Sequence, residues 1–158
     1  MYERILVPLD GSEVGEAALP YVEELVVKLL PATKVEITLF QAISSLMHYV
    51  VAGEASAQVP YTEKELDLIK RRTLDYLEKA GENLRGKGVI VKAKVSIGSA
   101  ADEIAKAADE VNADLIAMST HGRSGLSRFA FGSATDKVLR GGNRPVLMIR
   151  APRERAKT

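Results

Sequence analysis

Residues 5–12 read Ile5-Leu6-Val7-Pro8-Leu9-Asp10-Gly11-Ser12, an apolar run that stops at turn-forming residues. Such a run is typical of a buried strand that enters a tight turn. From Ser12, a residue type favoured as an N-cap, apolar residues recur at helical spacing up to Leu30-Pro31 and predict a helix. Pro20 lies inside it and predicts a kink near Glu16–Pro20, because proline lacks an amide hydrogen and its ring clashes with the preceding turn.

The same order of strand and helix recurs along the rest of the chain. Helices between successive strands imply a mostly parallel sheet with helices on both faces, so we expect a five-stranded α/β sandwich. Residues 44–61 show no clear period and predict an irregular loop, either a lid or a disordered segment. The further strands are expected at Val35–Ile43, Val89–Ile97, Asp114–Met118 and Pro145–Ile149, and the further helices are expected to begin at Thr62, Ser99 and Gly132.

Length and composition exclude several classes of protein. The chain has 158 residues, which suits one domain, placed here at residues 1–150 and followed by a disordered tail at 151–158. It has no cysteine, which excludes disulfides and thiolate metal sites and fits the cytoplasm. A net charge of +1 with 5% aromatic residues disfavours a nucleic-acid binder. No apolar run approaches the roughly 20 residues that span a bilayer, so we expect no membrane partner.

The ends of two predicted strands carry the candidate chemistry. Ligands of open α/β sheets bind beyond the carboxyl ends of the strands. Pro8-Leu9-Asp10 ends the first strand, and Met118–Gly125 follows the fourth and leads to Gly132-Ser133 at a helix start. Free amides and the helix dipole favour an anion there, and phosphate is the obvious candidate. The Ser133 and Thr135 hydroxyls could donate to it, and Asp10 could accept from a ribose hydroxyl.

Other interpretations of these residues stay open or are disfavoured. A glycine-rich turn with a serine N-cap also fits plain helix initiation. Neither G-x-x-x-x-G-K-[ST] nor G-x-G-x-x-G occurs, which disfavours a Walker-type NTPase and a dinucleotide dehydrogenase. The two histidines, His48 and His121, do not indicate a metal pair or a catalytic triad. No catalytic residue is assigned.

The chain resembles the universal stress protein family from Ile5 through Ile149. The most specific part is Met118-Ser119-Thr120-His121-Gly122, followed by nine residues and then Gly132-Ser133. This stretch is similar to the ATP-binding pattern of the family, G-x2-G-x9-G-[ST]. Ser119 stands where the pattern has its first glycine.

The resemblance implies a homodimeric cytoplasmic protein with strand order 3-2-1-4-5 that binds ATP or AMP, with Mg²⁺ accompanying the nucleotide rather than held by the protein. It would pair through its last strand, Val146-Leu147-Met148-Ile149. Arg123 and Arg128 are candidate phosphate contacts. Adenine and ribose would meet Pro8, Leu9, Asp10, Ala42, Met118 and Ser119, and the phosphates would meet Gly122, Gly132, Ser133, Ala134 and Thr135.

Three functions are compatible with these residues. The leading one is a dimeric stress or signalling module in which ATP or AMP biases contacts with other proteins. The second is slow ATP hydrolysis at the same site, although the chain offers no evident water-activating base and no Walker lysine. The third is a dimer that binds no nucleotide and acts through protein contacts, which would follow if Ser119 blocks the ribose. An apolar last strand at a sheet edge favours dimerisation independently, because an unpaired edge invites a second copy.

Overall fold

The computed structural model describes residues 2–30, 34–44, 46–52, 55–120 and 133–151. Its main sheet has five parallel strands in the spatial order β5-β2-β1-β6-β7. Counted along the chain within this sheet, the order is 3-2-1-4-5, as expected. The strands are β1 (Arg4–Pro8), β2 (Glu36–Ile43), β5 (Ile90–Ile97), β6 (Leu115–Thr120) and β7 (Val146–Arg150).

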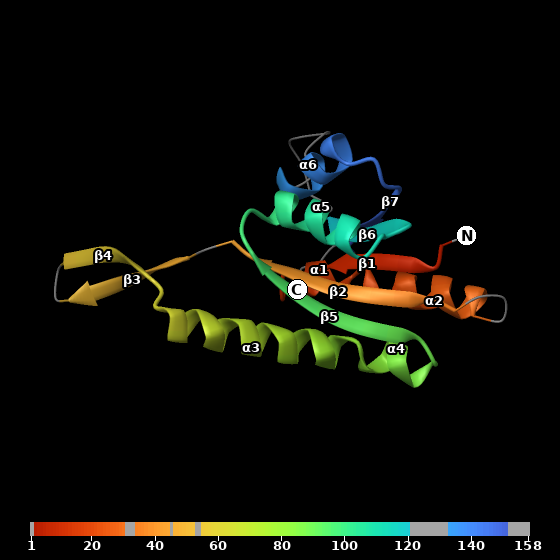
Figure 1. Ribbon diagram of the computed structural model, residues 1–158, viewed down its shortest axis with the longest axis horizontal. Coiled ribbons are helices and arrows are strands. Elements are labelled where there is room, and N and C mark those ends of the chain that lie inside the picture. Colours follow the sequence, from red (N-terminus) through yellow and green to blue (C-terminus); the bar gives the residue numbers. More distant parts are fainter. Residues whose placement is uncertain (1, 31–33, 45, 53–54, 121–132, 152–158) are drawn as a thin grey trace, which may run out of the picture.

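Helices cover both faces of this sheet (Figure 1). Successive side chains of a strand point to opposite faces of the sheet, so β1 contributes to two hydrophobic cores, one on each face. Ile5 and Val7 pack in the cluster that holds Val22 of α2 and Leu77 of α3, whereas Leu6 packs with Ile104 of α5. The helices are α2 (Leu19–Leu29), α3 (Glu63–Ala80) and α4 (Glu82–Gly86) on one face, and α5 (Ala100–Glu110) and α6 (Ser133–Gly141) on the other.

The first predicted helix is broken rather than kinked. It forms α1 (Glu13–Glu16) and then α2, and Pro20 lies in the first turn of α2. The missing amide hydrogen of proline costs little there, because amides of the first turn have no partner within the helix. The second predicted helix begins at Thr62 with a capping box, as its sequence indicates, and is interrupted at Gly81.

The expectation of an irregular segment at residues 44–61 is wrong. This segment forms an antiparallel hairpin of β3 (Met47–Ala52) and β4 (Ala55–Pro60), which projects from the sheet beyond α3 (Figure 1). Its residues pair with one another and not with the main sheet. Polar residues alternate with apolar ones only in β4, at Ser56 and Gln58, and not in β3, so the strand signal of this segment is weak.

The two edges of the main sheet differ. On β5, Lys92 Nζ lies 2.8 Å from Glu36 Oε2 and Lys94 Nζ lies 2.6 Å from Glu110 Oε2, so this edge carries charge. On β7 the apolar residues 146–148 are half-buried.

Among the described residues, no helix is both long enough and apolar enough to cross a membrane.

Candidate functional site

The site lies where the sheet changes winding direction. The chain runs from β1 outward through β2 to β5, and then returns to β6 on the other side of β1. The ladder between β1 and β2 extends to Pro8 and Phe40, whereas that between β1 and β6 includes only Ile5–Leu6 with Leu115–Ile116. The carboxyl ends of β1 and β6 are therefore not paired with each other. Open α/β sheets bind ligands at such a switch point.

The turn after β1 holds an exposed carboxylate in place. Asp10 Oδ1 accepts hydrogen bonds from Ser12 N at 2.9 Å and from Ser12 Oγ at 2.5 Å. Gly11 has φ +80°, a conformation that glycine adopts without strain. Before the turn, Pro8 and Leu9 have buried side chains, and Leu9 N donates to Phe40 O at 2.8 Å. At positions 8 and 9 a ligand would therefore meet mainly backbone.

The short helix α1 packs directly on this carboxylate. Gly15 N donates to Ser12 Oγ at 3.0 Å, so Ser12 caps α1 while also holding Asp10. A Cβ atom on Gly15 would overlap Asp10 Oδ1 and lie 3.3 Å from Asp10 N. Residue 15 can approach Asp10 this closely only because it has no side chain.

Ser119, near the end of β6, reaches the same helix. Its Oγ donates to Gly15 O at 3.0 Å and also lies within hydrogen-bonding distance of Val14 O. Ala117 faces the core beneath α2 and α3, and Met118 faces the core beneath α5. Ser119, two residues after Ala117, therefore points toward the α1 and α2 layer.

The remaining predicted site residues lie either in the hydrophobic core beneath α5 or at the start of α6. Ala42 packs against the cluster that contains Met118, which is 6% exposed. At the start of α6, Ser133 is exposed, Ala134 is half-buried and Thr135 is 6% exposed. Thr135 is thus less accessible than expected, whereas Ser133 is exposed.

Several predicted residues lie outside the described part of the chain, namely His121, Gly122, Arg123, Arg128 and Gly132. His48 lies in β3. Among the residues that the structure describes, no cluster of three or more histidine, aspartate or glutamate side chains is arranged to hold a metal ion.

Two polar residues near the site were missed by sequence reasoning. Tyr76 of α3 donates from its hydroxyl to Glu16 Oε1 of α1 at 2.8 Å. Burial, reinforced by this bond to a carboxylate, raises the pKa of Tyr76. Tyr76 and Glu16 line a cavity of about 490 Å³ between α2 and α3. Gln41, near the end of β2, has a buried Oε1 with no hydrogen-bond partner among the described residues. The available signal was an amide side chain between the apolar residues Phe40 and Ala42.

A doubly wound, Rossmann-like sheet with its candidate site at the switch point defines a class of α/β proteins that hold ligands beyond their strand ends. Within this class, the model of the universal stress protein family matches residues 1–150, and the chain belongs to this family.

Known relatives resemble the chain over nearly its whole length. Universal stress protein MJ0577 of Methanocaldococcus jannaschii is 29% identical over 157 residues, which cover 95% of this chain and 96% of that protein. A solved structure of MJ0577 matches with TM-score 0.70 and 25% identity, over 98% of this chain and 99% of that one.

Two solved relatives hold nucleotides. A universal stress protein of Archaeoglobus fulgidus in complex with dAMP matches with TM-score 0.61 and 22% identity, over 94% of this chain and 98% of that one. Another universal stress protein, in complex with cAMP, matches with TM-score 0.63 and 19% identity, over 94% of this chain and 97% of that one. At these identities the likeness shows a shared fold.

Proposed function

We propose that this protein binds an adenine nucleotide, ATP or AMP, at the unpaired carboxyl ends of β1 and β6. The observation that carries the proposal is the Asp10 carboxylate, exposed at the switch point and held by two hydrogen bonds from Ser12. A carboxylate fixed before the ligand arrives accepts from ribose hydroxyls without losing its own freedom on binding. The dAMP and cAMP complexes of solved relatives support the choice of an adenine nucleotide.

The proposed contacts follow the order of the ligand's parts. The ribose meets Asp10, and adenine lies against the backbone of Pro8 and Leu9 and against Ala42 and Met118. The phosphates, with any Mg²⁺ that accompanies them, meet the N-terminus of α6, where free amides and the helix dipole stabilise an anion. The phosphate-binding residues would be Gly122, Gly132, Ser133, Ala134 and Thr135, with Arg123 and Arg128.

Calorimetric titration tests nucleotide binding. ATP, ADP and AMP, each with and without Mg²⁺, are titrated into the wild type, Asp10→Asn and Glu13→Gln. Glu13 is an exposed carboxylate in α1, so its variant matches the loss of charge without touching the turn. We expect saturable binding by the wild type, affinity about tenfold or more weaker in Asp10→Asn, and little change in Glu13→Gln. Absence of heat up to millimolar nucleotide would overturn the proposal.

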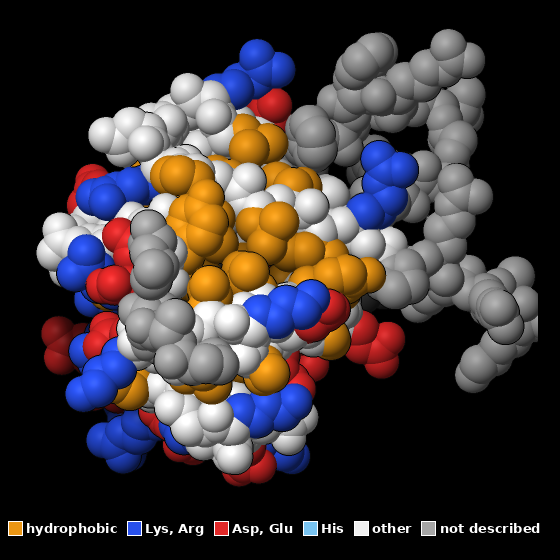
Figure 2. All heavy atoms as spheres, turned by 90° about the vertical axis from the view of Figure 1, so that its right-hand side faces the viewer, with side chains coloured by type: hydrophobic (Ala, Val, Ile, Leu, Met, Phe, Trp, Pro, Cys, Tyr) orange, Lys and Arg blue, Asp and Glu red, His pale blue; other side chains and the backbone are white. Residues whose placement is uncertain are grey.

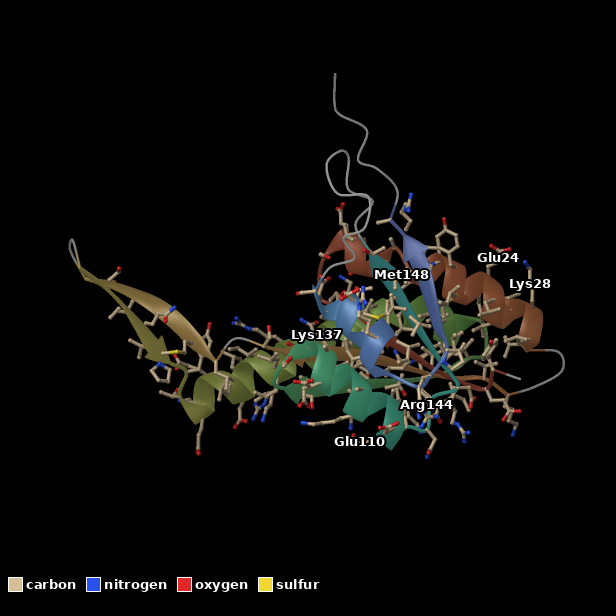
Figure 3. The ribbon with its side chains drawn as sticks, turned by 90° about the horizontal axis from the view of Figure 1, so that it is seen from above. Glu24, Lys28, Glu110, Lys137, Arg144 and Met148 are labelled. Atoms are coloured by element: carbon tan, nitrogen blue, oxygen red, sulfur yellow. The ribbon has the colours of Figure 1, made fainter. Side chains whose placement is uncertain are left out.

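We also propose that two copies pair through β7. This edge strand is apolar and half-buried, in contrast to the charged edge at β5. Figure 2 shows hydrophobic side chains gathered on the side of the molecule where β7 and α2 lie. Ile116 N donates to Pro145 O, so residues 145, 147 and 149 turn their backbone groups toward β6. The amide and carbonyl of Met148, labelled in Figure 3, therefore face outward, where a second strand would pair.

The oligomeric state tests this pairing. Light scattering is expected to give twice the 17.1 kDa chain mass for the wild type. Met148→Pro removes an outward amide without breaking the ladder to β6, and should yield monomers. Ala93→Pro is the matched control, because the pairing of Ile90 N with Val35 O turns odd-numbered β5 amides outward at the opposite edge. A monomeric wild type, or an equal effect of both variants, would contradict pairing through β7.

In the cell, we propose a cytoplasmic stress or signalling module in which bound nucleotide biases contacts with protein partners. The absence of cysteine in the chain is consistent with a reducing compartment.

A further inference from the structure

The short helix α1 depends on contacts from outside itself. With four residues, it is far below the length at which an isolated helix is stable in water. Its own backbone bonds are few, with Glu16 N donating to Ser12 O at 3.0 Å and Ala17 N donating to Val14 O at 3.2 Å. What holds α1 against the sheet therefore also determines where Asp10, which packs on Gly15, is placed.

One of these contacts comes from β6. Ser119 Oγ donates to Gly15 O at 3.0 Å and lies close to Val14 O, two carbonyl groups of α1. Ser119 is half-buried, so water competes less with this bond than at an open surface. The bond joins positions 104 residues apart in sequence and connects the end of β6 to the helix that follows β1.

The contact continues from Ser119 to the proposed ligand-binding carboxylate. Gly15 O accepts from Ser119, Gly15 N donates to Ser12 Oγ at 3.0 Å, and Ser12 Oγ donates to Asp10 Oδ1 at 2.5 Å. The α-carbon of Gly15 also packs on the Asp10 carboxylate. Each link is a hydrogen bond or a van der Waals contact, so a shift of α1 away from β6 displaces Asp10.

We propose that Ser119 is a positioning residue that ties α1 to β6 and so sets Asp10 for the ribose, an inference that rests on the proposed nucleotide-binding function. Ser119 replaces a glycine of the family's nucleotide-binding pattern, and its side chain is engaged by α1 carbonyl groups. The serine therefore acts as a tether. Its replacement by glycine or alanine loosens the turn and weakens binding.

The first test needs no nucleotide. Hydrogen exchange is measured at the amides of Gly15, Glu16 and Ala17, which donate to Ser12 Oγ, Ser12 O and Val14 O. In Ser119→Ala and Ser119→Gly we expect protection at these amides to fall about three- to tenfold, the equivalent of one hydrogen bond. Ser119→Thr retains the hydroxyl and should restore protection. Unchanged protection in the alanine and glycine variants would overturn the tether.

A matched control separates the tether from general loss of a serine. Ser96, near the end of β5, is also half-buried and donates from its hydroxyl, to Glu103 Oε2 at 2.7 Å. Ser96→Ala removes a comparable bond away from α1 and should leave protection at residues 15–17 unchanged. An equal fall in this variant would mean that the effect of Ser119 is global, which would contradict the proposal.

The second test measures AMP and ATP affinity by calorimetry in the same variants. We expect binding about three- to tenfold weaker in Ser119→Ala and Ser119→Gly, and within about twofold of wild type in Ser119→Thr and Ser96→Ala. Unchanged or tighter binding together with reduced protection would refute the positioning role. If the wild type binds no nucleotide, both the proposed function and the positioning role of Ser119 are refuted. The hydrogen-exchange data then still decide whether Ser119 ties α1 to β6.

Discussion

The hydroxyl of Tyr76 on α3 donates a hydrogen bond of 2.8 Å to Oε1 of Glu16 on α1, across 60 residues of sequence. Ser119 contacts the backbone of α1 from β6, and Tyr76 contacts its last side chain from α3. The helix next to the candidate site is thus anchored to two separate parts of the fold. Neither anchor is local in sequence, so the site takes shape only as the chain folds.

Removing the Tyr76 hydroxyl should destabilise the protein. Tyr76→Phe keeps the ring and deletes the donor, leaving a half-buried carboxylate without it, and we expect the free energy of unfolding to fall by about 1 kcal/mol. Urea denaturation measures the change. The control is Tyr21→Phe, because Tyr21 is 52% exposed on α2 and its hydroxyl can bond to water in both the folded and the unfolded protein. Equal losses in the two variants would contradict the role of the Tyr76–Glu16 bond.

Alkaline pH should weaken the fold through the same residue. The pKa of Tyr76 is raised in the folded protein, first by burial and then by the bond to Glu16. Its contribution to stability is therefore fully present below the unfolded pKa of about 10, and is lost as pH rises from there toward the folded value. Tyr76→Phe should flatten the fall in unfolding free energy above about pH 10. In an alkaline titration followed by phenolate absorbance, Tyr76→Phe should remove one ionisation that has a raised pKa, and an unaltered titration would count against the raised pKa.

Gly15→Ala should impair nucleotide binding more than stability. The new Cβ would overlap the Asp10 carboxylate and lie 3.3 Å from Asp10 N, so Asp10 must move. We expect nucleotide affinity to fall about tenfold or more, with a loss of about 1–2 kcal/mol in unfolding free energy. Gly86→Ala in α4 is the control, since a Cβ there meets no atom within 4 Å. Retained affinity in Gly15→Ala would show that the position of Asp10 is not critical.

Gly98→Ala should be destabilising without reference to any ligand. Gly98 has φ +149°, and a Cβ there would lie 2.9 Å from Glu103 Cγ. The backbone conformation and the contact both oppose a side chain, and we expect a loss of about 1–3 kcal/mol in thermal or urea denaturation. Gly141→Ala, where a Cβ meets nothing within 4 Å, should change stability by less than about 1 kcal/mol. A neutral Gly98→Ala would disprove the strain.

Asp114 should make stability depend on acid pH. Its Oδ2 accepts from Arg4 N at 2.8 Å and Glu3 N at 3.0 Å. Burial acts to raise the pKa of Asp114, but the amide hydrogen bonds and the nearby Arg4 charge outweigh it and hold the pKa below its ordinary value. The stabilisation is thus present above the unfolded pKa of about 3.9 and is lost as pH falls through the folded value.

Asp114→Ala should accordingly cost about 1–2 kcal/mol at neutral pH, because two amides at the start of β1 lose their acceptor. The difference from wild type should shrink as the pH falls below about 3.9. Urea denaturation across this range measures it, with the exposed Asp75→Ala on α3 as control. A difference that is constant with pH would show that the carboxylate charge is not what matters.

Much of the fold was predictable because its signals are local. Uninterrupted apolar runs such as Ile5–Leu9 indicate buried strands, and the capping box at Thr62 and Glu65 marks a helix start through bonds between near neighbours. The hairpin at residues 47–60 was missed, because β3 carries no clear alternation of apolar and polar residues and the alternation in β4 is confined to one short stretch. The break at Pro20 was anticipated only as a kink, since whether a helix bends or restarts depends on what it packs against.

The alternation of strands and helices, the five-stranded parallel sheet and the family pattern around Ser119 can all be read from the amino-acid sequence. Those features follow from backbone propensity and from apolar residues spaced to bury one face. The direction of the Ser119 side chain, the hydrogen bond from Tyr76 to Glu16 and the packing of Asp10 on Gly15 become visible only in the folded chain. These contacts join residues that come together only when α1, α3 and β6 pack. Hydrogen bonds of this kind follow neither helical nor strand periodicity, so the sequence pattern does not predict them.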